Sequence, residues 1–303
     1  MTSVPPPSQP SSSLPPHPEV PAGIVPSPGP PAVDGAGPRG SLGPVPAWAP
    51  LAAMIAAFVI ATIAYVVIAA GVEAGGGTVT AGGPPGLVIS ATLIQDVALI
   101  VAAVLLAGMW ARGLTPASFG LRSVPLGRAA GWTVLGFVMF WILTAIYISL
   151  VGQPDQQELT RDLREEESLA ALIGYGVLLA FVAPLAEELF FRGFVFGVLR
   201  EKIGAAWAAL ATGVVFGLVH VAGSPIGTVG VLIILGVLLC LLYQKTGSLL
   251  PCIALHAMNN AISFAATKSL PWFEAAVIVL ACTGAAIAVA ASVTQRPILL
   301  SRP

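Results

Sequence analysis

Long apolar runs recur along the chain from residue 47 onward, separated by short polar or glycine-containing connections. We count eight such runs, at residues 48–70, 87–110, 129–151, 169–199, 205–222, 226–243, 249–267 and 272–293. Each is near the ~20 residues with which an α-helix crosses the hydrocarbon core of a bilayer. Their apolar character extends around the whole helix and lacks the alternation of a transmembrane β-barrel. The pattern therefore predicts an all-α fold, a polytopic membrane helix bundle of about eight transmembrane helices.

The first 47 residues have a different composition. They contain 15 of the 27 prolines, together with glycine and serine, and no apolar run. Such a segment cannot bury enough apolar surface to offset the entropy that is lost on ordering. We therefore predict that residues 1–47 form a disordered Pro/Gly/Ser-rich tail.

Composition and charge favour a lipid environment. Only 9% of the residues are charged and 56% are hydrophobic, which leaves too few charges to cover a water-soluble domain. The formal net charge of -1 gives no electrostatic footprint for nucleic acid. Cys240, Cys252 and Cys282 lie in separate apolar runs without metal-binding spacing, so neither a disulfide framework nor a cysteine zinc site is expected.

The basic residues predict the orientation of the bundle. With both termini in the cytoplasm, the outer side holds only Arg161, Arg164 and Lys268. The inner side then holds Arg39, Arg112, Arg122, Arg128, Arg192, Arg200, Lys202, Lys245, Arg296 and Arg302. The positive-inside rule therefore favours a multi-pass protein of the cell membrane with both termini cytoplasmic.

Charged residues within the predicted spans are candidate functional residues, because a charge is expensive in hydrocarbon. Asp96 in the second run is either a carboxyl satisfied by a neighbouring helix or part of a catalytic or transport site. The fourth run contains Glu187, Glu188 and Arg192. Glu188 and Arg192 are four residues apart on one helical face, so the guanidinium can neutralise that carboxylate. Glu187 projects about 100° away and remains available for other work.

The two histidines outside the tail also lie in predicted spans. Runs four and five form an antiparallel hairpin that turns near residues 201–204, with Glu187 about 16 residues before its centre and His220 about 17 after it. His256 and Asn260 share a helical face and lie roughly 14 to 20 Å from the same side of the membrane. We therefore expect the four polar groups to lie at one depth.

Three motifs occur in order on apolar helices: Glu187-Glu188-x-x-x-Arg192, Phe216-x-x-x-His220 and His256-x-x-x-Asn260. Together they resemble the signature of the CAAX prenyl protease and bacteriocin-processing (CPBP) family of intramembrane proteases. On this basis residues 1–47 are the tail, 48–168 the first three transmembrane helices with their loops, 169–267 a catalytic core, and 268–303 the last transmembrane helix with a short C-terminal tail.

The resemblance implies an intramembrane endopeptidase. Glu187 would be the general base that activates a water, and His220 would help to hold that water. His256 and Asn260 would stabilise the tetrahedral oxyanion, while Arg192 held on Glu188 limits the local charge. The substrate implied is a peptide that is embedded in the lipid bilayer or lipid-anchored, of the CAAX type.

A metal mechanism is an alternative for the same residues. Glu187, His220 and His256 could form a His/His/carboxylate site of the kind that holds a catalytic zinc ion with an open position. The sequence has no H-E-x-x-H motif, and the family also fits a metal-free glutamate mechanism. The two schemes differ because a Glu187 that binds a metal is not a free base.

Two other functions remain open. The CPBP family includes members tied to bacteriocin immunity or regulation, so the chain could be a non-catalytic membrane regulator. Membrane charges can also line a transporter pathway. The complete set of motifs argues against a decayed site, and no inverted repeat with paired broken helices is evident.

Overall fold

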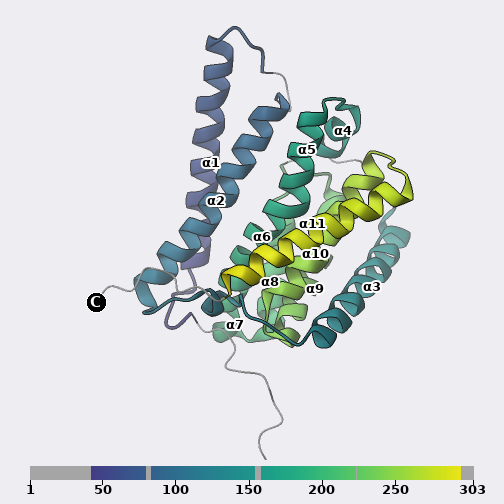
Figure 1. Ribbon diagram of the computed structural model, residues 1–303. Coiled ribbons are helices and arrows are strands. Elements are labelled where there is room, and N and C mark those ends of the chain that lie inside the picture. Colours follow the sequence, from purple (N-terminus) through teal and green to yellow (C-terminus); the bar gives the residue numbers. More distant parts are fainter. Residues whose placement is uncertain (1–41, 80–82, 154–157, 223, 295–303) are drawn as a thin grey trace, which may run out of the picture. The chain divides into compact units, whose positions relative to one another are not determined.

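The structure is a computed structural model that describes residues 42–79, 83–153, 158–222 and 224–294 (Figure 1). These residues belong to one compact unit, Pro38–Pro303. Its long helices are α1 (Ala49–Ala74), α2 (Pro85–Trp110), α3 (Leu126–Val151), α9 (Ile226–Thr246), α10 (Leu249–Thr267) and α11 (Trp272–Val293). Between α3 and α9 lie α4 (Glu158–Glu165), α5 (Leu169–Val177), α6 (Ala183–Glu187), α7 (Gly197–Ile203) and α8 (Ala205–Leu218). Three further helical elements are η1 (Pro116–Phe119), η2 (Leu178–Val182) and η3 (Glu188–Phe196).

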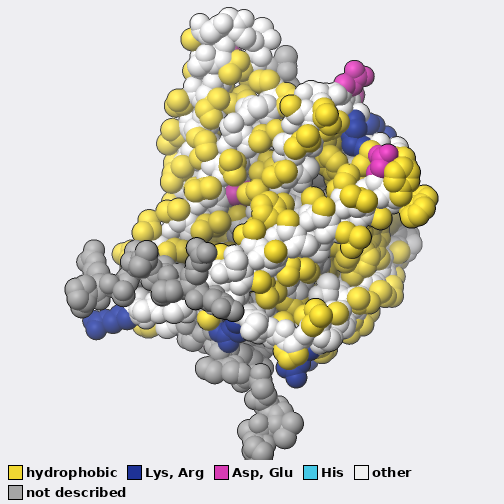
Figure 2. Space-filling view, in the orientation of Figure 1, with side chains coloured by type: hydrophobic (Ala, Val, Ile, Leu, Met, Phe, Trp, Pro, Cys, Tyr) yellow, Lys and Arg dark blue, Asp and Glu magenta, His cyan; other side chains and the backbone are white. Residues whose placement is uncertain are grey.

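The described residues form a helical membrane protein, as the hydropathy pattern predicts. Seven helical segments are long and apolar enough to cross a bilayer. Figure 2 shows apolar side chains over most of the middle of the visible face, where one acidic patch is seen, and the other charged side chains toward its ends. Such a surface suits lipid rather than water, because hydrocarbon solvates apolar side chains and cannot satisfy exposed polar groups.

The structure corrects the fifth predicted span, residues 205–222. The helix formed there, α8, has only 14 residues, about 21 Å at 1.5 Å per residue, and it ends at Leu218. Residues 219–222 are a turn that leads into α9. His220 therefore lies just beyond a helix end rather than within a spanning helix. The turn is as apolar as the helix before it, so the hydropathy pattern does not mark the helix end.

The predicted tail is also too long at its C-terminal end. Residues 1–41 lie outside the described residues, but Leu42 and Val45 are buried, with exposed fractions of 2% and 1%. Both belong to the main hydrophobic core. Two apolar side chains in a Pro/Gly-rich segment are thus enough to anchor its end in the bundle.

The helix α10 is central in the bundle. It packs against α3, α6, α9, α11, η2 and η3. Among the seven segments it is also the least apolar and the most buried. A helix that is enclosed by protein can carry polar side chains that lipid would not tolerate, so α10 is suited to present His256 and Asn260 to its neighbours.

Charged loops lie at the two ends of the bundle. At one end Lys268 Nζ donates hydrogen bonds to the backbone carbonyls of Arg164 and Glu166, which ties the α10–α11 turn to the α4–α5 connection. At the other end Ser248 Oγ donates to the carbonyl of Arg122. Figure 1 shows the start of α1 and the end of α11 at the same end of the bundle. The cytoplasmic location of that end stays a prediction, and Arg39, Arg296 and Arg302 lie outside the described residues.

Glycines bring α8 and α9 into close contact. A Cβ on Gly213 would lie 2.7 Å from the backbone nitrogen of Val237, and one on Gly236 would lie 2.8 Å from Gly213 Cα. Small residues at facing positions allow two helix backbones to approach in a membrane. This contact fixes the position of Phe216 and, one turn later, of His220.

We expect Gly213→Leu to destabilise the protein by about 1–3 kcal/mol, because the larger side chain overpacks the α8–α9 contact. Thermal unfolding of the purified protein in detergent micelles measures this. The matched control is Gly284→Leu in α11, where an added Cβ meets nothing within 4 Å. Equal shifts for the two variants would contradict the close packing.

Candidate active site

The fourth apolar run is one continuous helical segment, Leu169–Ile203, that changes its winding at the candidate site. Its elements η2 and η3 are π-helical, and α6 lies between them. Pro184 lies at the start of α6 and has no backbone N–H to donate, which favours a change of winding there. Wide turns of this kind are frequent at functional sites. Glu187 and Glu188 stand where α6 gives way to η3.

Arg192 lies on the same face of the helical segment as Glu188, because four residues make about one turn of either an α-helix or a π-helix. Arg192 Nη1 donates to Glu188 Oε1 at 2.8 Å, and both side chains have an exposed fraction of 0%. A second nitrogen, Nη2, donates to the carbonyl of Gly236 at 3.3 Å. The guanidinium also lies 4.5 Å from the centroid of the Phe216 ring, so the charge has partners on three helices.

His256 links the two glutamates. Its Nδ1 lies 2.8 Å from Glu188 Oε1, and its Nε2 lies 3.8 Å from Glu187 Oε2. An ionised carboxylate only accepts hydrogen bonds. His256 Nδ1 therefore carries a hydrogen and donates a hydrogen bond to Glu188. This leaves Nε2 directed toward Glu187. The result is a row of groups from Arg192 through Glu188 and His256 to Glu187.

Glu187 is the more accessible of the two acids. Its side chain is 17% exposed, whereas Glu188 is completely buried. The 3.8 Å between Glu187 and His256 is too long for a direct hydrogen bond and leaves room for a water that bridges the two groups at an angle. A carboxylate and an imidazole nitrogen that share one water form an arrangement able to remove a proton from it.

His220 is held beside this row by Phe216. Its Nδ1 lies 2.7 Å from the carbonyl oxygen of Phe216 and therefore donates to it, which leaves Nε2 as an acceptor when the ring is neutral. The Phe216 ring centroid is 5.1 Å from that of His220 and 5.9 Å from that of His256. Phe216 thus packs between the two imidazoles, and His220 contacts the row through that ring.

Asn260 hydrogen-bonds to a backbone carbonyl that Pro184 cannot serve. In η2 the Ala183 N–H donates to the Leu178 carbonyl, five residues back. The same register would pair the next carbonyl, of Leu179, with Pro184, which has no N–H. Asn260 Nδ2 donates to that carbonyl at 2.9 Å. One of its two amide hydrogens is used in this way, and the other can serve a substrate oxygen.

The structure brings some of the predicted residues together more closely than others. The contacts above join Glu187, Glu188, Arg192 and His256. His220 contacts this row through Phe216. Asn260 hydrogen-bonds to the backbone of η2. Sequence reasoning assigned Glu188 to Arg192 alone and missed its contact with His256, which lies 68 residues away. It also missed the Gly236 carbonyl, because a backbone acceptor leaves no mark in the sequence. Arg192, counted above with the inner loops, is buried in the site.

A catalytic zinc ion needs three protein ligands that converge on one point. Within the described ranges, no group of three or more His, Cys, Asp or Glu side chains is arranged to hold a metal ion. His256 Nδ1 donates to Glu188 and His220 Nδ1 donates to the Phe216 carbonyl, and a histidine held in this way can still bind a metal through Nε2. Glu187, His220 and His256 are nevertheless not gathered into such a group among the described residues, so the arrangement does not fit a zinc site and no step is assigned to a metal.

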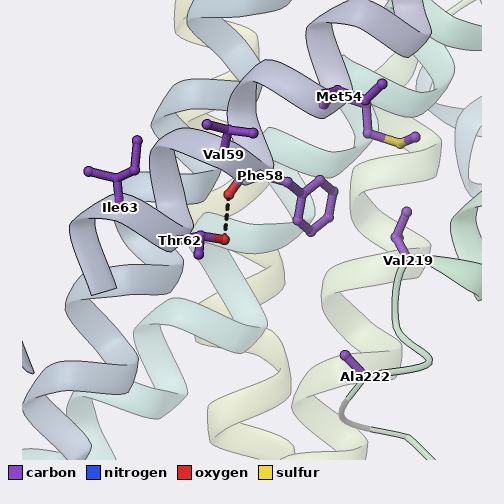
Figure 3. Close-up of a pocket in the computed structure, with 8 residues that line it drawn as sticks. Met54, Phe58, Val59, Thr62, Ile63, Val219 and Ala222 are labelled. Carbon is purple, nitrogen blue, oxygen red and sulfur yellow. Dashed lines mark hydrogen bonds between the residues drawn. The ribbon is translucent and has the colours of Figure 1, made fainter. Parts of the chain in front are cut away.

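An open apolar cavity of about 560 Å³ lies between α1 and the turn after α8 (Figure 3). Its wall is formed by Met54, Ile55, Phe58, Val59, Thr62 and Ile63 of α1, together with Val219 and Ala222 of the turn after α8. The Thr62 hydroxyl donates to the carbonyl of Phe58, one helical turn back, so the polar group in the wall is already bonded (Figure 3). Val219 directly precedes His220, so the turn after α8 contributes one residue to this apolar wall and the next to the candidate site.

Apolar spanning helices around a buried row of acid, imidazole and guanidinium groups define a multi-pass membrane protein with an intramembrane polar site. Residues 169–262 match the family described as Type II CAAX prenyl endopeptidase Rce1-like. The chain is also 26% identical over 153 residues to the Bacillus subtilis (strain 168) protein "Putative membrane peptidase YdiL", an alignment that covers 46% of this chain and 62% of that protein. No solved structure was found to match the chain. The resemblance to the membrane protease family, which the three motifs predict, is thereby confirmed.

Proposed function

We propose that the protein is an intramembrane endopeptidase that hydrolyses a peptide bond in a membrane-embedded or lipid-anchored, CAAX-like substrate with a water activated by Glu187. The observation that carries this proposal is the row Arg192, Glu188, His256, Glu187, in which the last two groups face each other at 3.8 Å. The match of residues 169–262 to a membrane endopeptidase family supports it.

Glu187 takes the role of general base in this scheme. The attacking water lies between its carboxylate and the imidazole nitrogens, loses a proton to Glu187 and adds its oxygen to the peptide carbonyl carbon. The C–N bond then breaks, and the proton held by Glu187 goes to the leaving amine. Catalysis by a positioned base of this kind contributes about 10²- to 10⁴-fold to a rate.

Glu188 and Arg192 act through His256. A buried carboxylate on Nδ1 fixes the orientation of the imidazole and stabilises its protonated form, in which Nε2 also donates. Protonated in this way, His256 can stabilise the oxyanion together with the second amide hydrogen of Asn260. Arg192 supplies the positive charge that compensates the buried Glu188 carboxylate at 2.8 Å.

The location of the site suits an apolar substrate. Water is scarce at this depth, which strengthens the electrostatic interactions of the row. The cavity between α1 and Val219 offers apolar wall beside His220 for the hydrophobic part of a substrate that enters from the lipid. The peptide bond would then reach the row while its anchor stays in hydrocarbon.

The proposal predicts substrates that accumulate when Glu187 is lost. Membrane-protein fragments and their new N-termini are compared in cells that carry wild-type protein, Glu187→Ala or the control Glu201→Ala, whose side chain is exposed on α7. We expect one set of membrane-derived fragments to be present with wild type and Glu201→Ala and absent with Glu187→Ala. Identical fragments in all three would overturn the proposal and favour a non-catalytic regulator.

A further inference from the structure

Asp96 on α2 is a buried carboxyl that the mechanism above does not use. Its exposed fraction is 2%, and its Oδ2 has no hydrogen-bond partner. Within the described part of the chain, Asp96 forms no ion pair with a basic side chain. An acid in this position is unusual, because a buried carboxylate is normally paired or hydrogen-bonded.

The position of Asp96 connects it to Glu187. The helix α2 packs against α1, α5, η2, α6 and η3. Titratable groups on these elements are Tyr65 and Glu73 on α1, Tyr175 on α5, Glu187 on α6, and Glu188 and Arg192 on η3. The helix α6 has only five residues, Ala183–Glu187, and Glu187 is its titratable group, so the packing of α6 on α2 brings this acid to the helix that carries Asp96. Arg192 does not compensate for Asp96, because it is bound to Glu188.

Two neighbouring carboxyls in an apolar environment do not both remain ionised unless a cation lies beside them. Glu187 is 17% exposed and faces His256 Nε2 at 3.8 Å, so its ionised form has a polar partner. Asp96 is nearly inaccessible and its Oδ2 is unpaired. The proton of the pair is therefore best placed on Asp96, where it removes the isolated buried charge.

We propose that Asp96 is a positioning residue for Glu187: its neutral carboxyl donates a hydrogen bond to a bridging water, which in turn donates to the Glu187 carboxylate. This inference rests on the proposed function for its catalytic meaning. Through this water the O–H of Asp96 holds one oxygen of Glu187, and the other oxygen stays directed toward His256 and the attacking water. Asp96 thereby extends the row from η3 and α10 to α2.

Infrared spectroscopy of the full-length protein in lipid vesicles tests the proton directly and needs no substrate. We expect wild type at neutral pH to show the C=O stretch of a protonated carboxylic acid, sensitive to exchange into D₂O. Asp96→Asn removes this band, and Glu187→Gln shifts it, because an amide is a weaker acceptor than a carboxylate. Asp96→Asn keeps the size of the side chain, and its thermal unfolding is measured alongside.

Every other result overturns the inference. No such band in wild type would mean that Asp96 is ionised. A band lost in Glu187→Gln and kept in Asp96→Asn would place the proton on Glu187. A band that Glu187→Gln leaves unchanged would show that the two side chains are not linked through the bridging water. None of these results depends on peptide cleavage, so failure of this inference is distinguishable from failure of the proposed function.

Cleavage of a probe gives the catalytic consequence. The probe is an internally quenched peptide with an S-farnesyl cysteine near its carboxyl terminus. We expect Asp96→Ala to lower kcat about 10- to 100-fold with little change in KM, the loss expected for a hydrogen bond to a charged group. Asp96→Asn restores most of kcat, because its amide can donate in the same place. An Asp96→Ala enzyme with wild-type kcat would contradict the positioning role.

Discussion

Glu187→Gln is expected to lower kcat for peptide cleavage by about 10²- to 10⁴-fold, the contribution of a positioned general base. Glutamine has nearly the same size and can still contact a water, but it does not accept the proton. Because the substrate binds through other groups, KM should change little. Steady-state kinetics of the purified protein in lipid vesicles, with the farnesylated quenched peptide as probe, measures both constants.

Two controls separate loss of chemistry from loss of structure. Glu201→Gln removes an exposed glutamate of α7 and should retain wild-type kcat. Thermal unfolding of Glu187→Gln should stay close to wild type, since this side chain is partly exposed and makes no direct hydrogen bond to His256. A folded Glu187→Gln protein that still cleaves at the wild-type rate would show that another group is the base.

Breaking the buried pair between Glu188 and Arg192 is expected to have the largest effect on stability. Glu188→Leu leaves the fully buried guanidinium of Arg192 without its carboxylate and should destabilise the protein by about 3–5 kcal/mol. The double variant Glu188→Leu/Arg192→Leu removes both charges and should recover most of that stability. It should still be inactive, because His256 Nδ1 then has no acceptor. Thermal unfolding in micelles and cleavage of the same probe give the two readings.

The matched control is Arg128→Leu, which removes an exposed arginine at the start of α3. Substitutions of this kind usually change stability by less than about 0.5 kcal/mol. Recovery of both stability and cleavage in the double variant would contradict the role of Glu188 in orienting His256. Failure of the double variant to recover stability would show that the contacts to Gly236 and Phe216 dominate the burial of Arg192.

Local patterns in the sequence were sufficient for most of the helices and for one contact of the site. The pair of Glu188 and Arg192 follows from a spacing of four residues, which any helical winding brings onto one face. The end of α8 was not predictable in this way, because Val219 and Ala222 are as apolar in a turn as they would be in a helix. The π-helical winding of η3 likewise depends on packing around Pro184 and Arg192 and has no simple sequence pattern.

Contacts between distant segments required the tertiary structure. Glu188 meets His256 across 68 residues, and Arg192 reaches the carbonyl of Gly236 across 44. Asn260 was predicted to face a substrate, and the structure adds its bond to Leu179, which arises because Pro184 cannot serve that carbonyl. The site roles of Glu187, His220, His256 and Asn260 stay predictions that the variants above test.

The sequence by itself determined that this chain is a helical membrane protein and which polar side chains enter the bilayer. Hydrocarbon forces each spanning segment to satisfy its own backbone, so the helices follow from local composition. Only the tertiary structure decided which of those polar groups contact one another. That choice depends on a few ångströms between helices, set by the packing of glycines and phenylalanines far apart in the chain.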